Sequence, residues 1–125
     1  MKPRDTVLRL KKFEADEKAR KVADLEAMIR DFETMAADLD RQIRGEEDRT
    51  GVKDIQHFAY STFAKAAAQR RDNLRASTSE LKTKLEAAQA ERDEALAQLN
   101  RAATPEPRED LRMRRAERPQ TAAMR

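Results

Sequence analysis

Apolar residues recur along the first part of the chain at alternating steps of three and four positions. The series runs Val22, Leu25, Ile29, Phe32, Ala36, Leu39 and Ile43, and Leu8 and Ala15 extend it toward the N-terminus at seven-residue steps. This heptad pattern is typical of a helix that lays one narrow apolar stripe against a partner helix. It predicts a helix over about residues 4–44.

A second heptad series follows in the later part of the chain. Its members are Leu74, Thr78, Leu81, Leu85, Ala88, Arg92, Ala95 and Leu99. It predicts a second helix over about residues 52–101, and the two stripes are expected to form the seam of a coiled coil. The expected seam residues are Leu8, Ala15, Val22, Leu25, Ile29, Phe32, Leu39, Ile43, Leu74, Leu81, Leu85, Ala88 and Leu99.

Helix-breaking residues are nearly absent from both predicted helices. The only two glycines, Gly45 and Gly51, lie six residues apart, and neither predicted helix contains a proline. Since glycine is common directly after the last residue of a helix, Gly45 predicts the end of the first helix. We therefore expect an all-α fold, an antiparallel two-helix coiled-coil hairpin over residues 1–101 with its turn at 45–51.

A turn centred near residue 48 also predicts how the two helices align. Val22 is expected to face Leu74, and Ala15 to face Leu81, so that the two apolar stripes coincide. In this alignment the second helix projects beyond the start of the first. Its last two turns are then expected to have no partner helix.

Two apolar stripes, instead of one, run along residues 52–71. One continues the second seam through Tyr60, Ala64 and Ala67, and the other contains Val52, Ile55, Ala59, Phe63 and Ala66. Two explanations are open. In the first, the seam drifts from one stripe to the other and both are buried. In the second, one stripe is an exposed docking face, for which Phe63, Ala66 and Arg70 are the expected residues.

Charge is distributed unevenly along the chain. Charged residues make up 41% of the 125 residues and aromatic residues only 4%, which suits an apolar seam better than a thick core. Residues 101–125 hold seven arginines against four acidic residues, which accounts for the formal net charge of +3. Pro105 and Pro107 end the heptad pattern, and we expect residues 102–125 to form a basic, disordered tail.

Few residues suit catalysis or metal binding. The chain has no cysteine and one histidine, His57, so a zinc site lacks its usual ligands. Both glycines lie at the predicted turn, which leaves none for a phosphate-binding loop. We expect no catalytic residue, no cofactor and no metal. No apolar run approaches the roughly 18 residues of a membrane span, so direct membrane insertion is not expected either.

Three stretches are distinctive beyond their heptad pattern. They are Leu8-Arg9-Leu10-Lys11-Lys12-Phe13-Glu14, then Glu17-Lys18-Ala19-Arg20 followed by Val22, and the turn that leads into Ile55-Gln56-His57-Phe58. Together they resemble the flagellar FliJ family over about residues 1–100. The resemblance implies a cytoplasmic, non-enzymatic component of the flagellar type III export apparatus, held near the inner membrane by its partners. It also implies a coiled coil similar to the central stalk of rotary ATPases.

The resemblance implies three kinds of partner. Family members insert into the ring of the export ATPase, bind the cytoplasmic part of the membrane export gate, and are implicated in escorting export chaperones. The segments that enter the ATPase ring correspond to about residues 4–20 and 85–101. The basic tail is expected to extend that contact.

The resemblance also assigns a gate-binding strip early in the second helix. The corresponding positions are Ala59, Phe63, Ala66 and Arg70. Phe63 and Ala66 match the family pattern in character, whereas Ala59 and Arg70 depart from it. Phe58 or Tyr60 is the alternative for a shifted contact.

Other functions are compatible with the same pattern. One is a structural coiled-coil protein that self-associates, and another is the stalk of a related virulence type III secretion system. A third is a protein that binds nucleic acid or anionic lipid through the basic tail. Nucleic acid is not expected as a partner, because the tail mixes acidic residues with its arginines and has no aromatic residue to stack on bases.

Overall fold

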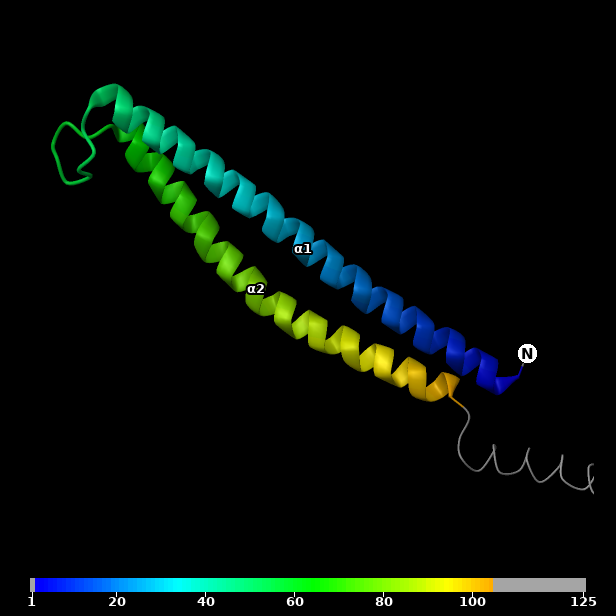
Figure 1. The fold of residues 1–125 in the computed structure, drawn as a ribbon. Helices are drawn as coiled ribbons and strands as arrows, with labels where there is room; N and C mark the ends of the chain where they lie inside the picture. The colour runs from blue at the N-terminus through cyan, green and yellow to red at the C-terminus, as the bar shows by residue number, and fades with distance from the viewer. Residues whose placement is uncertain (1, 105–125) are drawn as a thin grey trace, which may run out of the picture. The chain divides into compact units, whose positions relative to one another are not determined.

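The computed structural model describes residues 2–104 of the chain, and these residues form two helices (Figure 1). Helix α1 is Pro3–Thr50 and helix α2 is Thr62–Ala103, and they pack against each other in opposite directions. The predicted all-α, antiparallel two-helix hairpin is thus confirmed. The tail was predicted to be disordered, and its residues from 105 onward lie outside the described part of the chain.

The first helix is longer than the sequence predicted. Gly45 does not end it, because one glycine inside a helix costs only about 1 kcal/mol and the residues after it favour the helix. Gly51 ends it instead, with a positive φ of 73°. Its N–H donates to the carbonyl oxygen of Glu47 at 2.9 Å, which is the hydrogen bond that closes a helix on a left-handed residue. The predicted turn at 45–51 was therefore wrong.

The second helix begins ten residues later than predicted, at Thr62 instead of residue 52. Ser61 caps it, because its Oγ accepts the N–H of Ala64 at 3.2 Å and its carbonyl oxygen accepts the N–H of Lys65 at 3.0 Å. Residues 51–61 form the connecting loop, which is longer than the predicted turn. A serine that precedes an apolar helical stretch is a recognisable start signal, so this boundary was accessible from the sequence.

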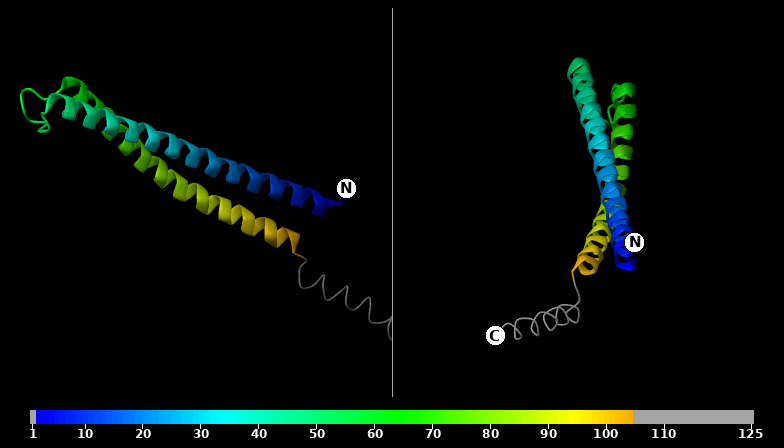
Figure 2. Two further views of the ribbon diagram at one scale, coloured as in Figure 1. Left: turned by 45° about the horizontal axis from the view of Figure 1, so that its top comes forward. Right: turned by 90° about the vertical axis from the view of Figure 1, so that its right-hand side faces the viewer.

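The described residues belong to two compact units. One is Ala19–Ala90, and the other joins Met1–Lys18 with Glu91–Arg125, of which 2–18 and 91–104 are described. Within each unit, a segment of α1 lies beside a segment of α2 (Figure 2). Neither helix in this part of the chain combines the length and the apolar character needed to cross a membrane.

Every residue predicted for the seam is buried or half-buried. On α1 the buried residues recur at seven-residue steps, and Leu25, Phe32 and Leu39 between them are half-buried. The buried residues of α1 are Ala15, Val22, Ile29, Ala36 and Ile43, and those of α2 are Ala64, Ala67, Ala68, Thr78, Leu81 and Ala88. The hydroxyl of Thr78 donates to the carbonyl oxygen of Leu74 at 2.8 Å, so this polar group is satisfied inside the seam.

Ion pairs across unit Ala19–Ala90 define how the helices align. Asp40 accepts a hydrogen bond from Arg75 at 2.7 Å. The ion pairs of Asp40 with Arg71 and of Glu33 with Lys82 agree with the same alignment. It places Val22 opposite Ala88, two heptads farther along α2 than the predicted partner Leu74. The predicted alignment was wrong because a heptad pattern looks the same after a shift by whole heptads. The longer first helix and the later start of the second select the observed one.

The predicted overhang of the second helix was also wrong. The last turns of α2 are paired with the first turns of α1 in the unit that contains both chain ends. The contacts are Lys18 Nζ to Glu91 Oε2 at 3.1 Å, Lys11 Nζ to Gln98 Oε1 at 3.0 Å, and Arg4 Nη2 to the Ala103 carbonyl oxygen at 3.4 Å. Lys11 and Lys18 therefore bridge between the helices at positions where α1 carries leucine or phenylalanine farther along.

Two neighbouring residues of α1 test the seam directly. Ile29 is 6% exposed and Met28 is 44% exposed. We expect Ile29→Ala to lower the free energy of unfolding by about 2 to 4 kcal/mol, because it removes buried methyl groups, and Met28→Ala to lower it by less than about 1 kcal/mol. Urea denaturation followed by circular dichroism measures both. Equal losses in the two variants contradict the burial pattern.

Candidate docking surface

The two apolar stripes near the start of α2 have different environments. Ala64, Ala67 and Ala68 pack on Ile43 of α1, and this stripe is buried. Phe63 on the other stripe is 58% exposed. The stripes are therefore not both part of the seam, and the second explanation, an exposed face, describes the geometry.

The exposed face of α2 carries three of the four residues that the sequence assigned to partner binding. Phe63, Ala66 and Arg70 are exposed and follow one another at steps of three and four, so they share one side of the helix. We call these three residues the Phe63 strip. Ala59 is exposed but lies in the loop, because Ser61 starts the helix after it. Its assignment to a helical strip was wrong.

The loop that precedes the Phe63 strip presents further apolar side chains. Phe58 is 96% exposed and Ile55 is 46% exposed. The Phe58 ring stacks on the His57 imidazole, with ring centres 4.7 Å apart. The Nδ1 atom of His57 accepts the N–H of Ala59 at 3.0 Å, so the single histidine organises the loop. Of the two alternative contact residues, Phe58 points outward, whereas Tyr60 is half-buried.

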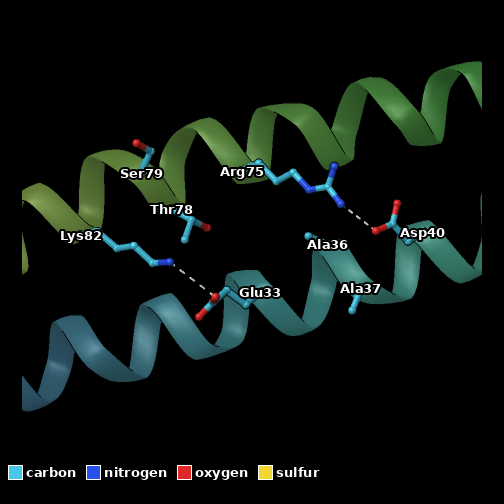
Figure 3. Close-up of a pocket in the computed structure, with 8 residues that line it drawn as sticks. All are labelled: Glu33, Ala36, Ala37, Asp40, Arg75, Thr78, Ser79 and Lys82. Carbon is cyan, nitrogen blue, oxygen red and sulfur yellow. Dashed lines mark hydrogen bonds and ion pairs between the residues drawn. The ribbon is translucent and has the colours of Figure 1, made fainter.

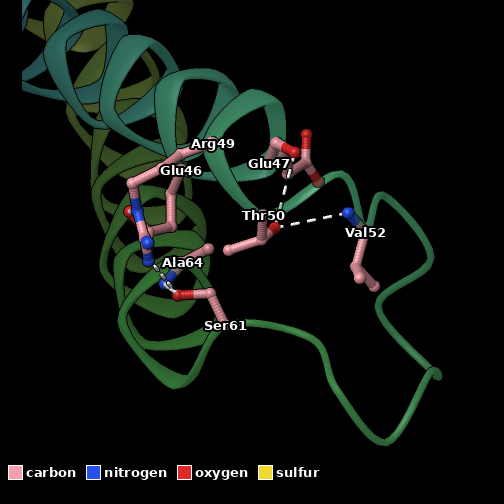
Figure 4. A network of polar contacts seen from close by, with 7 residues as sticks. All are labelled: Glu46, Glu47, Arg49, Thr50, Val52, Ser61 and Ala64. Carbon is pink, nitrogen blue, oxygen red and sulfur yellow. Dashed lines mark hydrogen bonds and ion pairs between the residues drawn. The ribbon is translucent and has the colours of Figure 1, made fainter.

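Four polar residues connect the loop to the end of α1, and we call Glu46, Glu47, Tyr60 and Ser61 the tip clasp. Figure 4 draws three of them, Glu46, Glu47 and Ser61. Tyr60 Oη donates to Glu47 Oε2 at 2.8 Å, and Ser61 Oγ donates to Glu46 Oε1 at 2.9 Å. Arg49 also binds Glu46, through Nε at 3.1 Å. This clasp could not be predicted from the sequence, because acidic residues such as Glu46 and Glu47 are also common in the first turn of a helix.

The tip clasp shifts the pKa of two of its members. The hydrogen bond from Arg49, and then that from Ser61, lowers the pKa of Glu46. The hydrogen bond to Glu47, and then burial, raises the pKa of Tyr60. The ionised form of Glu46 thus stabilises the fold above its unfolded pKa, and this contribution is lost as pH falls through the lowered value. The neutral form of Tyr60 contributes stability that is lost as pH rises through its raised pKa.

One edge of the hairpin in unit Ala19–Ala90 is closed by ion pairs, and we call it the Asp40 edge (Figure 3). Asp40 binds Arg71 at 2.8 Å and Arg75 at 2.7 Å, and Glu33 lies 3.7 Å from Lys82. The hydrogen bond from Arg71 lowers the pKa of Asp40, against the opposing effect of burial. The cleft of about 400 Å³ on this edge is therefore spanned by charges that neutralise one another.

A second groove on the same unit includes Arg70, and we call it the Arg70 groove. It measures about 440 Å³ and is lined from both helices by Met35, Asp38, Leu39, Gln42, Arg70, Asn73 and Leu74. Met35 is 49% exposed, and Leu39 and Leu74 are half-buried. Arg70 belongs to both the groove and the Phe63 strip. The sequence did not point to this groove, because it depends on which residues of α1 lie beside Arg70.

The unit that contains the chain ends includes most of the segments that the FliJ resemblance assigns to the ATPase ring. Its α1 segment exposes three apolar side chains: Val7 at 48%, Leu10 at 55% and Phe13 at 62%. The basic tail from residue 105 onward, which was expected to extend this contact, lies outside the described residues.

No group of three or more histidine, cysteine, aspartate or glutamate side chains in residues 2–104 is arranged to hold a metal ion. Comparisons with protein-family models, with curated proteins and with solved structures found no match.

The single tyrosine makes the tip clasp measurable. Titration of tyrosinate absorbance is expected to give a pKa for Tyr60 above its ordinary value. Glu47→Gln should bring the pKa back toward the ordinary value, since it removes the carboxylate that accepts the hydrogen bond of the neutral phenol and repels the tyrosinate. Asp48→Asn is the matched control, because Asp48 faces Lys53 at 3.8 Å instead. Equal pKa values in the wild type and Glu47→Gln contradict the clasp.

Proposed function

We propose that this chain is a non-enzymatic stalk and adaptor of the flagellar type III protein export apparatus. It acts in the cytoplasm at the base of the flagellum and is held at the inner membrane by its partners. The observation that carries the proposal is the exposure of the Phe63 strip. These residues occupy the positions that the FliJ resemblance gives to the export-gate contact.

The two compact units of the chain suit two different partners. The Phe63 strip, together with exposed Phe58, belongs to the unit that contains the loop, and it contacts the cytoplasmic part of the export gate. The unit with both chain ends enters the ring of the export ATPase and stimulates it. An aromatic side chain that is already exposed and held on a helix is suited to anchor a protein contact, because little conformational entropy is lost on binding.

The tip clasp supports the mechanical part of the proposal. Side-chain hydrogen bonds from Tyr60 and Ser61 fix the loop to the last turn of α1. A stalk that relates an ATPase ring to a membrane gate needs such a fixed end, since a flexible one transmits no orientation. Export chaperones are the third class of partner in this proposal.

A self-associating coiled coil is the second candidate function. The observation that favours it is the exposure of Val7, Leu10 and Phe13 along the start of α1, since exposed apolar side chains at helical spacing often mark a helix contact. In this case the protein builds dimers or bundles and has no effect on an ATPase.

Two phenylalanines of similar exposure, Phe63 and Phe13, distinguish specific binding to the gate from non-specific hydrophobic binding. We expect Phe63→Ala to weaken binding to the purified cytoplasmic part of the export gate by at least about tenfold, without loss of helicity. Phe13→Ala, on the other unit, is the matched control, with gate affinity unchanged. Isothermal titration calorimetry measures both, and circular dichroism checks the fold.

The ATPase assay completes this test. The wild-type chain and Phe63→Ala are expected to stimulate the purified export ATPase equally, because the strip is on the unit assigned to the gate. Absence of stimulation, together with concentration-dependent oligomers in sedimentation, contradicts the stalk proposal and supports the self-associating coiled coil. Loss of folding in Phe63→Ala contradicts the assignment of Phe63 to an exposed face.

A further inference from the structure

The two edges of the hairpin in unit Ala19–Ala90 differ in how their charges are satisfied. On the Asp40 edge, the arginines and Lys82 that reach across the helices have carboxylate partners within the chain. On the other edge, Arg70 has no ion-pair partner among residues 2–104. The acidic residue of the Arg70 groove does not compensate it, because Asp38 pairs with Arg41.

The floor of the Arg70 groove is apolar and adaptable. Met35, Leu39 and Leu74 supply its apolar side chains, two from α1 and one from α2. Methionine is unbranched and flexible, and it is common on surfaces that accept helices of varied sequence. A third helix laid along the edge of two packed helices contacts both of them, as in helix-in-groove recognition.

We propose that the Arg70 groove binds an amphipathic helix of a partner protein that carries an acidic residue beside its apolar stripe. The apolar side chains of that helix cover Met35, Leu39 and Leu74, and its carboxylate pairs with Arg70. The inference deepens the proposed function and rests on it, because Arg70 also belongs to the strip assigned to the gate. It adds α1 to a contact that the sequence placed on α2 alone.

Charge complementarity identifies the partner's chemistry. A basic helix would leave Arg70 beside a like charge, and an uncharged apolar helix would leave it without a counterion at the rim of a desolvated contact. A helix that docked on the Asp40 edge would have to compete with ion pairs that are already formed. An acidic amphipathic helix in the Arg70 groove meets neither obstacle.

Two synthetic peptides test the proposal without any export protein. Each is an amphipathic helix of about 18 residues, long enough for measurable helicity, and they differ only in one glutamate that is replaced by lysine in the second. The full-length chain, labelled at its methionine methyl groups, is titrated with each peptide by NMR. We expect the Met35 signal to shift and the Met28 signal to stay, since Met28 is similarly exposed but does not line the groove.

Variants of the chain test the charge preference and the apolar contact separately. The glutamate peptide should bind about three- to tenfold more tightly than the lysine peptide, and Arg70→Glu should reverse that preference. Met35→Ala should weaken the binding of the glutamate peptide by about tenfold, while Met28→Ala leaves it unchanged. Circular dichroism of each variant checks that the hairpin is intact.

Several outcomes overturn the proposal. One is that the Met35 signal does not shift with either peptide at millimolar concentration. Another is equal affinity for the two peptides in both the wild type and Arg70→Glu. A third is a Met35 shift that follows protein concentration without peptide, because the occupant is then a second copy of the chain. Peptide binding that persists while the gate fails to bind contradicts the proposed function and leaves the groove assignment intact.

Discussion

The alignment of the two helices decides which side chains of this protein are available to a partner. It is set by contacts near the loop, where Glu46 and Glu47 hold Ser61 and Tyr60, and by Asp40, which binds Arg71 and Arg75 from the facing helix. Apolar burial alone does not select it, because heptad seams match again after every shift of seven residues. The polar contacts therefore supply specificity, and the seam supplies most of the stability.

The same alignment separates the two edges of the hairpin within unit Ala19–Ala90. Asp40 and Glu33 find their partners across the seam, so the Asp40 edge is closed. On the opposite edge, Met35 and Leu39 lie beside Arg70 and Leu74 and form a groove in which Arg70 has no ion-pair partner among the described residues. If the helices were shifted by two heptads, as the sequence suggested, different residues of α1 would border Arg70. The proposed binding surface is thus a consequence of the alignment and not of α2 alone.

The hydrophobic pattern of the sequence predicted which residues are buried. It did not predict where the helices end or which residues of the two helices lie opposite each other. Spacing identified the buried Val22, Ile29 and Ile43, because a repeat of three and four residues determines which side of a helix is covered. It also found the second stripe that contains Phe63. The end of α1 was predicted wrongly from Gly45, since glycine occurs both inside a helix and at its end.

The start of α2 and the clasp were missed for different reasons. Ser61 was a local signal that the sequence offered, because serine favours the capping position. The hydrogen bond from Tyr60 to Glu47 joins residues on either side of a loop and has no local pattern. The Arg70 groove likewise needs residues of both helices. Long-range contacts of this kind follow only once the alignment is known.

The alignment can be measured by disulfide cross-linking, since the chain has no cysteine of its own. Val22 and Ala88 are each 2% exposed and lie opposite each other in the observed alignment. The double variant Val22→Cys with Ala88→Cys is expected to form an intramolecular disulfide readily under mild oxidation. Val22→Cys with Leu74→Cys is expected to stay reduced within the monomer. Efficient cross-linking of Val22 to position 74, and none to position 88, would contradict the alignment and with it the binding surface built on it.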